Sequence, residues 1–281
     1  MASPRDWIRL APRQPGIERL EAYFSGHGYD PHRHDTYAIG MTLSGVQLFD
    51  YRGTTVHSHL GRAITVHPDE VHDGRAGSET GFRYRIAYIE PRLIQAALGD
   101  TPRPLPFTGA GTTEDARLIR AILPALQDLD RPLEDLQLDQ IIAEVAAALV
   151  ALDRSNRQPR LPRANARAVD LARGFLDAHA EQMVASEHLE AVTGLDRFAL
   201  ARHFRACLGT TPHRYQVMRR LDRARRLMQS GASLADAAAA SGFADQAHMT
   251  RQFKKAYGIS PGRWQRTTSL LKVGPCATET S

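Results

Sequence analysis

The residues from Gly194 to Trp264 contain one pattern twice. The first copy reads Gly194-Leu-Asp-Arg-Phe-Ala-Leu-Ala-Arg-His-Phe204, and the second reads Gly242-Phe-Ala-Asp-Gln-Ala-His-Met-Thr-Arg-Gln-Phe253. A Gly-x-[Thr/Ser]-Pro motif follows each copy, ending at Pro212 and at Pro261. The two phenylalanines, and likewise the two prolines, are separated by 49 residues. A repeat of this length indicates a duplicated structural unit.

Each copy predicts two short helices joined by a tight turn. In the second copy, Ser233 caps the first helix, Gly242 ends it, and Asp245 caps the next helix. Met249 and Phe253 stand four residues apart, which places both on the buried face of that helix. The first copy has the matching residues Ser186, Gly194, Asp196, Leu200 and Phe204. A second helix with a polar outer face is typical of a helix-turn-helix unit.

A further helix is expected to join the two units. Thr211 and Pro212 supply an N-cap and a first-turn proline, and Ser260 and Pro261 do the same for a later helix. The joining helix should run to about Gln229, and its roughly 18 residues span about 27 Å. With packing at each end, the two outer helices would lie about 34 Å apart, one turn of B-DNA. Its apolar face comprises Tyr215, Met218, Leu221 and Met228, and its other side Arg219, Arg220, Arg223, Arg225 and Arg226.

From about Arg167 to Arg266, the chain resembles the DNA-binding domain of AraC/XylS-type transcriptional regulators. The match is carried by Gly242-Phe-Ala-Asp-Gln-Ala-His-Met-Thr-Arg-Gln-Phe-Lys-Lys and by Tyr257-Gly-Ile-Ser-Pro-Gly-Arg-Trp. The resemblance implies binding to double-stranded promoter DNA, with RNA polymerase as a candidate partner. It places the base-contacting positions on Arg197, Phe198, Ala201, Arg202, Gln246, Ala247, Thr250 and Arg251.

The arginines in this set have two readings. An isolated Arg on a helix surface is usually only a solvent-exposed side chain, but Arg202 and Arg251 occupy the same position in the two copies of the repeat. An Arg in the major groove can bind guanine through two hydrogen bonds. We expect Arg205 and Lys254 to contact phosphates, which adds affinity without sequence choice. Phe198 could touch a thymine methyl group or close the core, and we favour the contact with DNA.

Charge divides the 281 residues into two unlike halves, as two domains would. Residues 1–153 carry 15 Lys and Arg against 21 Asp and Glu, whereas residues 154–281 carry 21 against 10. The basic half therefore needs a polyanion, and nucleic acid is the default partner. The two cysteines, Cys207 and Cys276, allow no disulfide framework or Cys-x-x-Cys site. Because no leader-like start or apolar run of membrane length occurs, we expect a cytoplasmic protein without a membrane partner.

The first half predicts an antiparallel sandwich or barrel. After an irregular arm to about residue 18, alternation begins at Leu20, and turn signals then separate several short strand-like runs. On the last run, Phe82, Tyr84, Ile86 and Tyr88 would share one face. The runs are Thr36–Leu43, Val46–Tyr51, Thr54–His59, Ala63–His67 and Phe82–Ile89.

This half resembles a cupin, through Gly26-x5-His32-Arg-His34 and through Gly61 to Pro68-Asp-Glu-Val-His72-Asp-Gly74. The resemblance implies a small-molecule effector site, for which our candidates are His32, His34, Tyr37, Glu70 and His72. His32, His34 and His72 could alternatively hold a metal ion. The Glu that metal cupins carry shortly after the second His is absent, because Ala38 and Ile39 stand there. We therefore expect no metal and no cofactor.

Helical periodicity replaces the strand pattern after the barrel. Arg92–Leu98 predicts a short helix, Thr113 caps a second helix to Leu126, and a third runs from Pro132 to Leu152. The third helix carries an apolar stripe that either covers the barrel or forms a homodimer interface, which the regulator family also implies. The stripe is Leu138, Ile141, Ile142, Val145 and Leu149.

The expected fold is thus α+β with two domains. A cupin-like ligand-binding barrel occupies residues 1–112, a helical dimerisation segment 113–153, a polar linker 154–166 and an all-α double helix-turn-helix domain 167–272. The tail after Leu271 is expected to be disordered.

Three functions compete. The first is a transcriptional regulator whose promoter binding responds to an effector in the barrel. The second is a metal-dependent cupin enzyme with secondary DNA binding, for which metal analysis with a His32→Ala control is the discriminating measurement. The third, a DNA-repair methyltransferase, would need a cysteine-based zinc site and a reactive Cys motif that the two cysteines cannot supply. We expect the regulator and no enzymatic activity.

Overall fold

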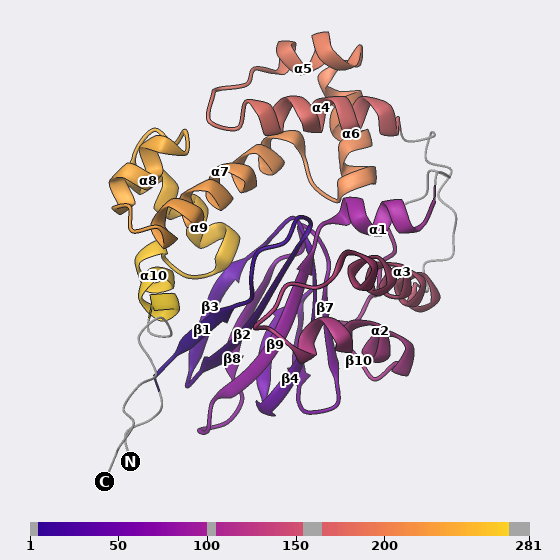
Figure 1. The fold of residues 1–281 in the computed structure, drawn as a ribbon, viewed down its shortest axis with the longest axis vertical. Coiled ribbons are helices and arrows are strands. Elements are labelled where there is room, and N and C mark those ends of the chain that lie inside the picture. The colour runs from indigo at the N-terminus through magenta and orange to yellow at the C-terminus, as the bar shows by residue number, and fades with distance from the viewer. Residues whose placement is uncertain (1–4, 100–104, 154–164, 270–281) are drawn as a thin grey trace.

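The computed structural model describes residues 5–99, 105–153 and 165–269 (Figure 1). The N-terminal half is two antiparallel sheets, one of six strands in the order β1-β2-β9-β4-β7-β10 and one of four in the order β3-β8-β5-β6. The strands are β1 Trp7–Leu10, β2 Ile17–Phe24, β3 His27–His32, β4 Tyr37–Gly45, β5 Gln47–Tyr51, β6 Thr54–Ser58, β7 Ala63–Val66, β8 His72–Ala76, β9 Phe82–Ile89 and β10 Thr112–Thr113. The expected antiparallel β architecture is confirmed.

Four strands, β1, β3, β8 and β10, depart from the pattern read in the sequence. The prediction of an irregular arm to residue 18 is wrong for Trp7–Leu10, which pairs with β2 from Trp7 opposite Tyr23 to Leu10 opposite Leu20. The strands β3 and β8 were not expected. They pair with each other through irregular registers, with His32 opposite His72, so pairing rather than local alternation makes them strands.

The inner faces of the two sheets share one core. Phe82, Tyr84 and Ile86 of β9 are buried there with Phe24 and Phe49, and Tyr88 packs against the same cluster. The face predicted for these four β9 residues is therefore confirmed. Alternate residues of β9 lie on the opposite face, where Ala87 and Ile89 join a second cluster under the helices.

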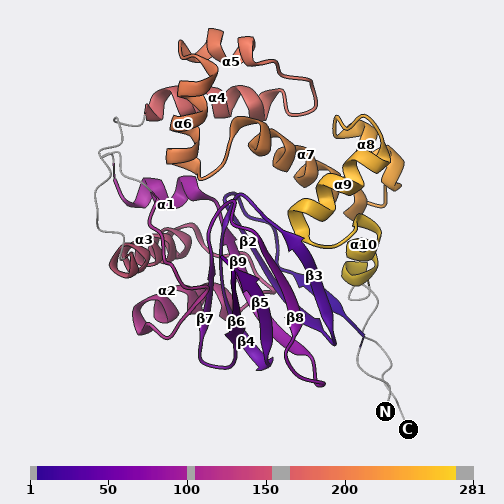
Figure 2. The same ribbon diagram turned by 180° about the vertical axis from the view of Figure 1, so that it is seen from behind.

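Three helices cover that opposite face of the large sheet (Figure 2). They are α1 Pro91–Ala97, α2 Ala116–Gln127 and α3 Asp135–Leu152. Ile141, Ile142, Val145 and Leu149 of α3 are buried with residues of α2 and with Tyr37 and Ile39 of β4, and Leu138 packs at the edge of the cluster. The apolar stripe is thus buried within the N-terminal half, where α3 packs mainly against α2 and α1. Thr113 does not cap α2 as expected, because Asp115 does so by accepting from the backbone N–H of Arg117.

The C-terminal half contains seven helices in the described residues. They are α4 Ala166–Ala178, α5 Ser186–Thr193, α6 Arg197–Leu208, α7 Pro212–Gln229, α8 Leu234–Ala240, α9 Gln246–Tyr257 and α10 Pro261–Ser269. The side chains of Asp196, Thr211, Ser233 and Asp245 accept backbone N–H groups at the starts of α6, α7, α8 and α9, as predicted. Ser186 is not a cap, since Ala185 precedes α5 and makes no capping bond.

Two helix-turn-helix units, α5–α6 and α8–α9, are joined by α7 (Figure 1). The predicted inner residues Phe204 and Phe253 are both 0% exposed. The first unit has its own cluster around Phe204, whereas Phe253 and Met249 belong to the cluster that includes the barrel interior. The second unit therefore shares a core with the N-terminal half.

Two boundary predictions fall largely outside the described residues. The linker predicted at residues 154–166 lies outside them except for its last two positions, and the tail after Leu271 lies outside them entirely. Within the part of the chain that the structure describes, none of the helices is both long and apolar enough to cross a membrane.

Candidate nucleic-acid interface and ligand pocket

The outer faces of α6 and α9 carry the residues proposed to read DNA. Capping by Asp196 and Asp245 fixes where each helix starts, and the buried phenylalanines fix which face points outward. Arg197, Phe198, Arg202, Gln246, Ala247 and Arg251 are exposed, and Ala201 and Thr250 are partly exposed. Phe198 is 65% exposed, with the Arg197 guanidinium 5.1 Å from its ring centre, so it does not close the core.

The two cations nearer the ends of these helices face the acidic half. Lys254 Nζ lies 2.6 Å from Asp30 Oδ2, and Arg205 Nη2 lies 3.3 Å from Asp69 Oδ2. Hydrogen bonding to Lys254 is the main reason that the pKa of Asp30 is lowered. Neither cation is free in this arrangement.

The arginines of α7 have roles that periodicity did not assign. Arg220 Nε and Arg223 Nε donate to the carbonyl oxygens of Ala180 and Ala240, which braces the neighbouring turns. Arg219 Nη2 pairs with Asp35 at 3.0 Å. Of the five α7 arginines predicted to face outward, Arg226 is the one that is exposed.

Arg225 is buried, contrary to its expected outward position. It donates two hydrogen bonds of 2.8 and 2.9 Å to the carboxylate of Glu18 on β2. Its guanidinium lies 4.9 Å from the ring centre of Tyr257 and 5.1 Å from that of Trp264. Burial lowers and the Glu18 carboxylate raises the pKa of Arg225, and the net shift is upward. The arginine is therefore a charged group inside the contact between the halves.

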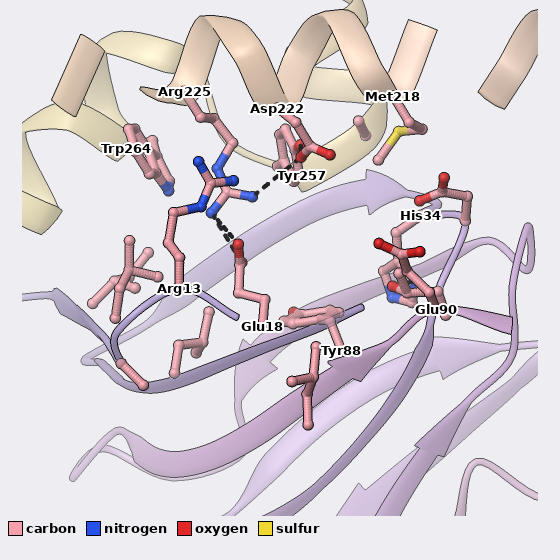
Figure 3. A pocket seen from close by; sticks show the side chains of 18 of the residues that line it. Arg13, Glu18, His34, Tyr88, Glu90, Met218, Asp222, Arg225, Tyr257 and Trp264 are labelled. Carbon is pink, nitrogen blue, oxygen red and sulfur yellow. Dashed lines mark hydrogen bonds and ion pairs between the residues drawn. The ribbon is translucent and has the colours of Figure 1, made fainter. Parts of the chain in front are cut away.

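A cavity of about 170 Å³ opens at this contact (Figure 3). One wall comes from β1, β2, β3 and β9, and the other from α7, α9 and α10. Arg13, Glu18 and Arg225 gather at one end, while His34 and Glu90 lie at the other. Tyr88 and Tyr257 lie between the two ends, and Met218 lies toward the His34 end. Arg225 is paired with Glu18 and lies 3.9 Å from Asp222, whereas Arg13 is exposed at the rim and has no ion pair among the described residues.

Of the five predicted ligand-binding residues, the structure brings His32, His34 and His72 together and places Tyr37 and Glu70 elsewhere. His32 and His34 line the cavity. Tyr37 points to the helical side of the sheet, where its hydroxyl donates to the Pro106 carbonyl at 2.9 Å. Glu70 lies at the surface opposite Arg52, and His72 stands behind the cavity with its ring 4.2 Å from that of His32.

Sequence reasoning missed Arg13, Glu18, Arg225 and Trp264. They meet only because the halves dock, and no local pattern brings together residues more than 200 positions apart. His32 and His34 were predicted from the cupin-like motif, and Tyr88 was detectable through its place on the inner face of β9.

The three histidines form a cluster of neutral rings. The Nδ1 atoms of His32, His34 and His72 donate to the carbonyl oxygens of Asp30, Thr36 and Glu70. Burial lowers the pKa of His72 to about 4, and burial with the neighbouring imidazoles lowers those of His32 and His34 well below 6.5. Among residues 5–99, 105–153 and 165–269, no group of three or more His, Cys, Asp or Glu side chains could hold a metal ion.

Comparison with known proteins places both halves. A family model described as the AraC-like ligand binding domain matches residues 14–146, and a helix-turn-helix domain model matches residues 189–267. The chain is 23% identical over 242 residues to YbfI, an HTH-type transcriptional regulator of Bacillus subtilis (strain 168), covering 82% of this chain and 86% of that protein.

Two solved structures of ToxT from Vibrio cholerae have a similar fold. One is 12% identical, with a TM-score of 0.64 and coverage of 90% of this chain and 99% of that one. The other, determined with an unsaturated fatty acid bound, is 10% identical, with a TM-score of 0.61 and coverage of 96% and 98%. At these identities the likeness establishes the two-domain fold.

Proposed function

The chain belongs to the AraC-type transcriptional regulators with a ligand-binding domain, and from this premise we propose that an effector held between its halves controls promoter binding. The observation that carries the proposal is the cavity at the contact between the barrel and the α7–α10 region. A ligand there touches both halves, so it can favour one arrangement of the helix-turn-helix units over another. We propose no enzymatic activity and a cytoplasmic location.

We propose that α6 and α9 enter successive major grooves of the promoter. The exposure of Arg202 and Arg251, one at the same point of each unit, supports guanine contacts by both side chains. The other candidate base contacts are Arg197, Phe198, Ala201, Gln246, Ala247 and Thr250.

Arg202→Ala and Arg251→Ala are each expected to weaken binding to the cognate site by about five- to 150-fold, because a bidentate contact contributes about 1–3 kcal/mol of discrimination. The cognate duplex would first be selected from a random library with the wild-type protein, and gel shifts would compare it with a scrambled duplex. Arg226→Ala is the control, since Arg226 is exposed on α7 outside both units. Unchanged specificity in both variants would remove the assignment.

We propose that the effector is an apolar carboxylic acid. The exposed Arg13 and the buried Arg225 offer two guanidinium groups at one end of the cavity, where a ligand carboxylate would compete with Glu18 for Arg225. The aromatic and aliphatic walls between the ends suit an apolar body. The fatty acid bound in the ToxT structure is of this class and supports the proposal. His32 and His34 would line the far end.

Arg225→Met is expected to abolish the rise in melting temperature that a fatty-acid ligand causes, because the carboxylate loses its buried partner. The probe is a panel of saturated and unsaturated fatty acids from short to long chains. Arg226→Met makes the same change one residue away at an exposed position and should keep the full ligand-induced rise. The ligand-induced difference is the readout, so a lower baseline stability of Arg225→Met does not affect it. A full response in Arg225→Met would contradict the assignment.

We propose a homodimer that uses residues 113–152, with RNA polymerase as a further partner. Because the α3 stripe is buried mainly against α2 and α1, the contact would use the apolar side chains that stay exposed on α2 and α3, namely Leu123, Leu136 and Val150. Leu136 is 83% exposed, so Leu136→Glu should shift the sedimentation profile at micromolar concentration from dimer to monomer. A monomeric wild-type profile would count against this interface.

A further inference from the structure

Two carboxylates of the N-terminal half form ion pairs with basic side chains at matching positions of the two helix-turn-helix units. Arg205 of α6 and Lys254 of α9 are 49 residues apart, which is the period of the repeat. Asp69 lies 3.3 Å from Arg205, and Asp30 lies 2.6 Å from Lys254. The carboxylates come from two separate segments of the barrel, before β8 and within β3. A chance surface contact would not be expected to meet both units at the same position.

The barrel also contacts the glycine that ends each of these two helices. Gly209 and Gly258, again one period apart, have φ values of +70° and +68°. A Cβ on Gly209 would lie 2.8 Å from Pro68 Cβ, and a Cβ on Gly258 would lie 2.7 Å from the Asp30 carbonyl oxygen. Backbone bonds from Asp30 N to Gly258 O (2.8 Å) and from Arg33 N to Lys255 O (3.0 Å) complete the second contact. The barrel thus docks against the same end of both DNA-reading helices.

We propose that Asp30 and Asp69 take the places of two DNA phosphates, so that the docked barrel competes with duplex DNA for both helix-turn-helix units at once. The inference rests on the proposed DNA-binding function and adds a regulatory role for these two carboxylates. A carboxylate and a phosphate present the same kind of anionic oxygen to Arg and Lys. The base-reading candidates Arg202 and Arg251 stay exposed on the same helices, so the competition falls on the backbone contacts.

The test is the affinity of the full chain for a duplex of random sequence at low salt. Such binding depends on phosphate contacts and needs no knowledge of the operator. In Asp30→Asn/Asp69→Asn, both cations become available, and the affinity should rise roughly two- to thirtyfold, since each exposed pair contributes about 0.2–1 kcal/mol. Asparagine suits the positive φ of Asp69, which is 63°, so the backbone is preserved.

A matched control separates this effect from the loss of negative charge. Glu79→Gln/Asp139→Asn removes the same charge at exposed positions before β9 and on α3, and should change the affinity less than twofold. The rise in Asp30→Asn/Asp69→Asn should also fall to the control level when Arg205 and Lys254 are replaced by alanine, as a double-mutant cycle requires. Melting temperatures verify that every variant is folded.

The outcomes distinguish the inference from the function on which it rests. A rise confined to Asp30→Asn/Asp69→Asn and lost without the two cations supports it. Equal duplex binding by wild type, Asp30→Asn/Asp69→Asn and control overturns the competition and leaves DNA binding in place. If none of the three binds duplex DNA at low salt, both the competition and the proposed function are wrong.

Discussion

Lowering the pH from about 7.5 to about 5.5 is expected to reduce the free energy of unfolding of the N-terminal half by roughly 3–5 kcal/mol. Four buried histidines carry this effect. Burial lowers the pKa of His67 and of His72 to about 4 and lowers those of His32 and His34 well below 6.5. Since the unfolded chain titrates near 6.5, it binds more protons than the folded one between the two values. Stability is therefore complete above about pH 6.5 and is lost as the pH falls toward 4.

The measurement is urea unfolding at a series of pH values, with the slope of stability against pH as the readout. Each histidine contributes a slope that grows from near zero at pH 7.5 to at most about 1.4 kcal/mol per pH unit near pH 5.5. His72→Asn should reduce the slope by about one proton, whatever it does to the baseline. His59→Asn, at an exposed position, is the matched control and should keep the wild-type slope. Identical slopes for wild type and His72→Asn would refute the role of the cluster.

Phe253→Ala is expected to destabilise the second helix-turn-helix unit by about 3–5 kcal/mol, because it empties a fully buried site. The ring is 0% exposed and packs 4.6 Å from Tyr257 and 6.0 Å from Trp264, centre to centre. Phe253 also belongs to the cluster that continues into the barrel, so the loss should be felt in both halves.

Phe198→Ala is the matched control, since the same truncation is made at a ring that is 65% exposed. Its free energy of unfolding should change by less than about 0.5 kcal/mol, as at other surface sites. Circular dichroism during urea unfolding compares the two variants. A similar loss in both would mean that Phe198 is structural and that its assignment to DNA contact is wrong.

The helical half could be read from the sequence because its signals are local. Asp196, Ser233 and Asp245 cap helices within three residues of themselves, and the spacing of Met249 and Phe253 fixes one buried face. The strands β3 and β8 escaped notice because pairing between distant segments, with irregular register, creates them. The cavity could not be predicted for the same reason, because nothing near Arg225 in the sequence shows that Glu18 will contact it. Tyr37 was misplaced because alternation on β4 gives two faces without saying which one meets the ligand.

The first and last described elements of the chain, β1 and α10, pack against each other. Arg263 of α10 pairs with Asp6 at 2.9 Å and donates to the carbonyl oxygens of His27 and Gly28. Cleavage of the chain between residues 153 and 165 would therefore leave two fragments that remain associated and co-purify. Protease cleavage or co-expression of the two fragments would therefore preserve the contact between the halves. The DNA binding of the C-terminal half without that contact would be measurable only on that fragment by itself.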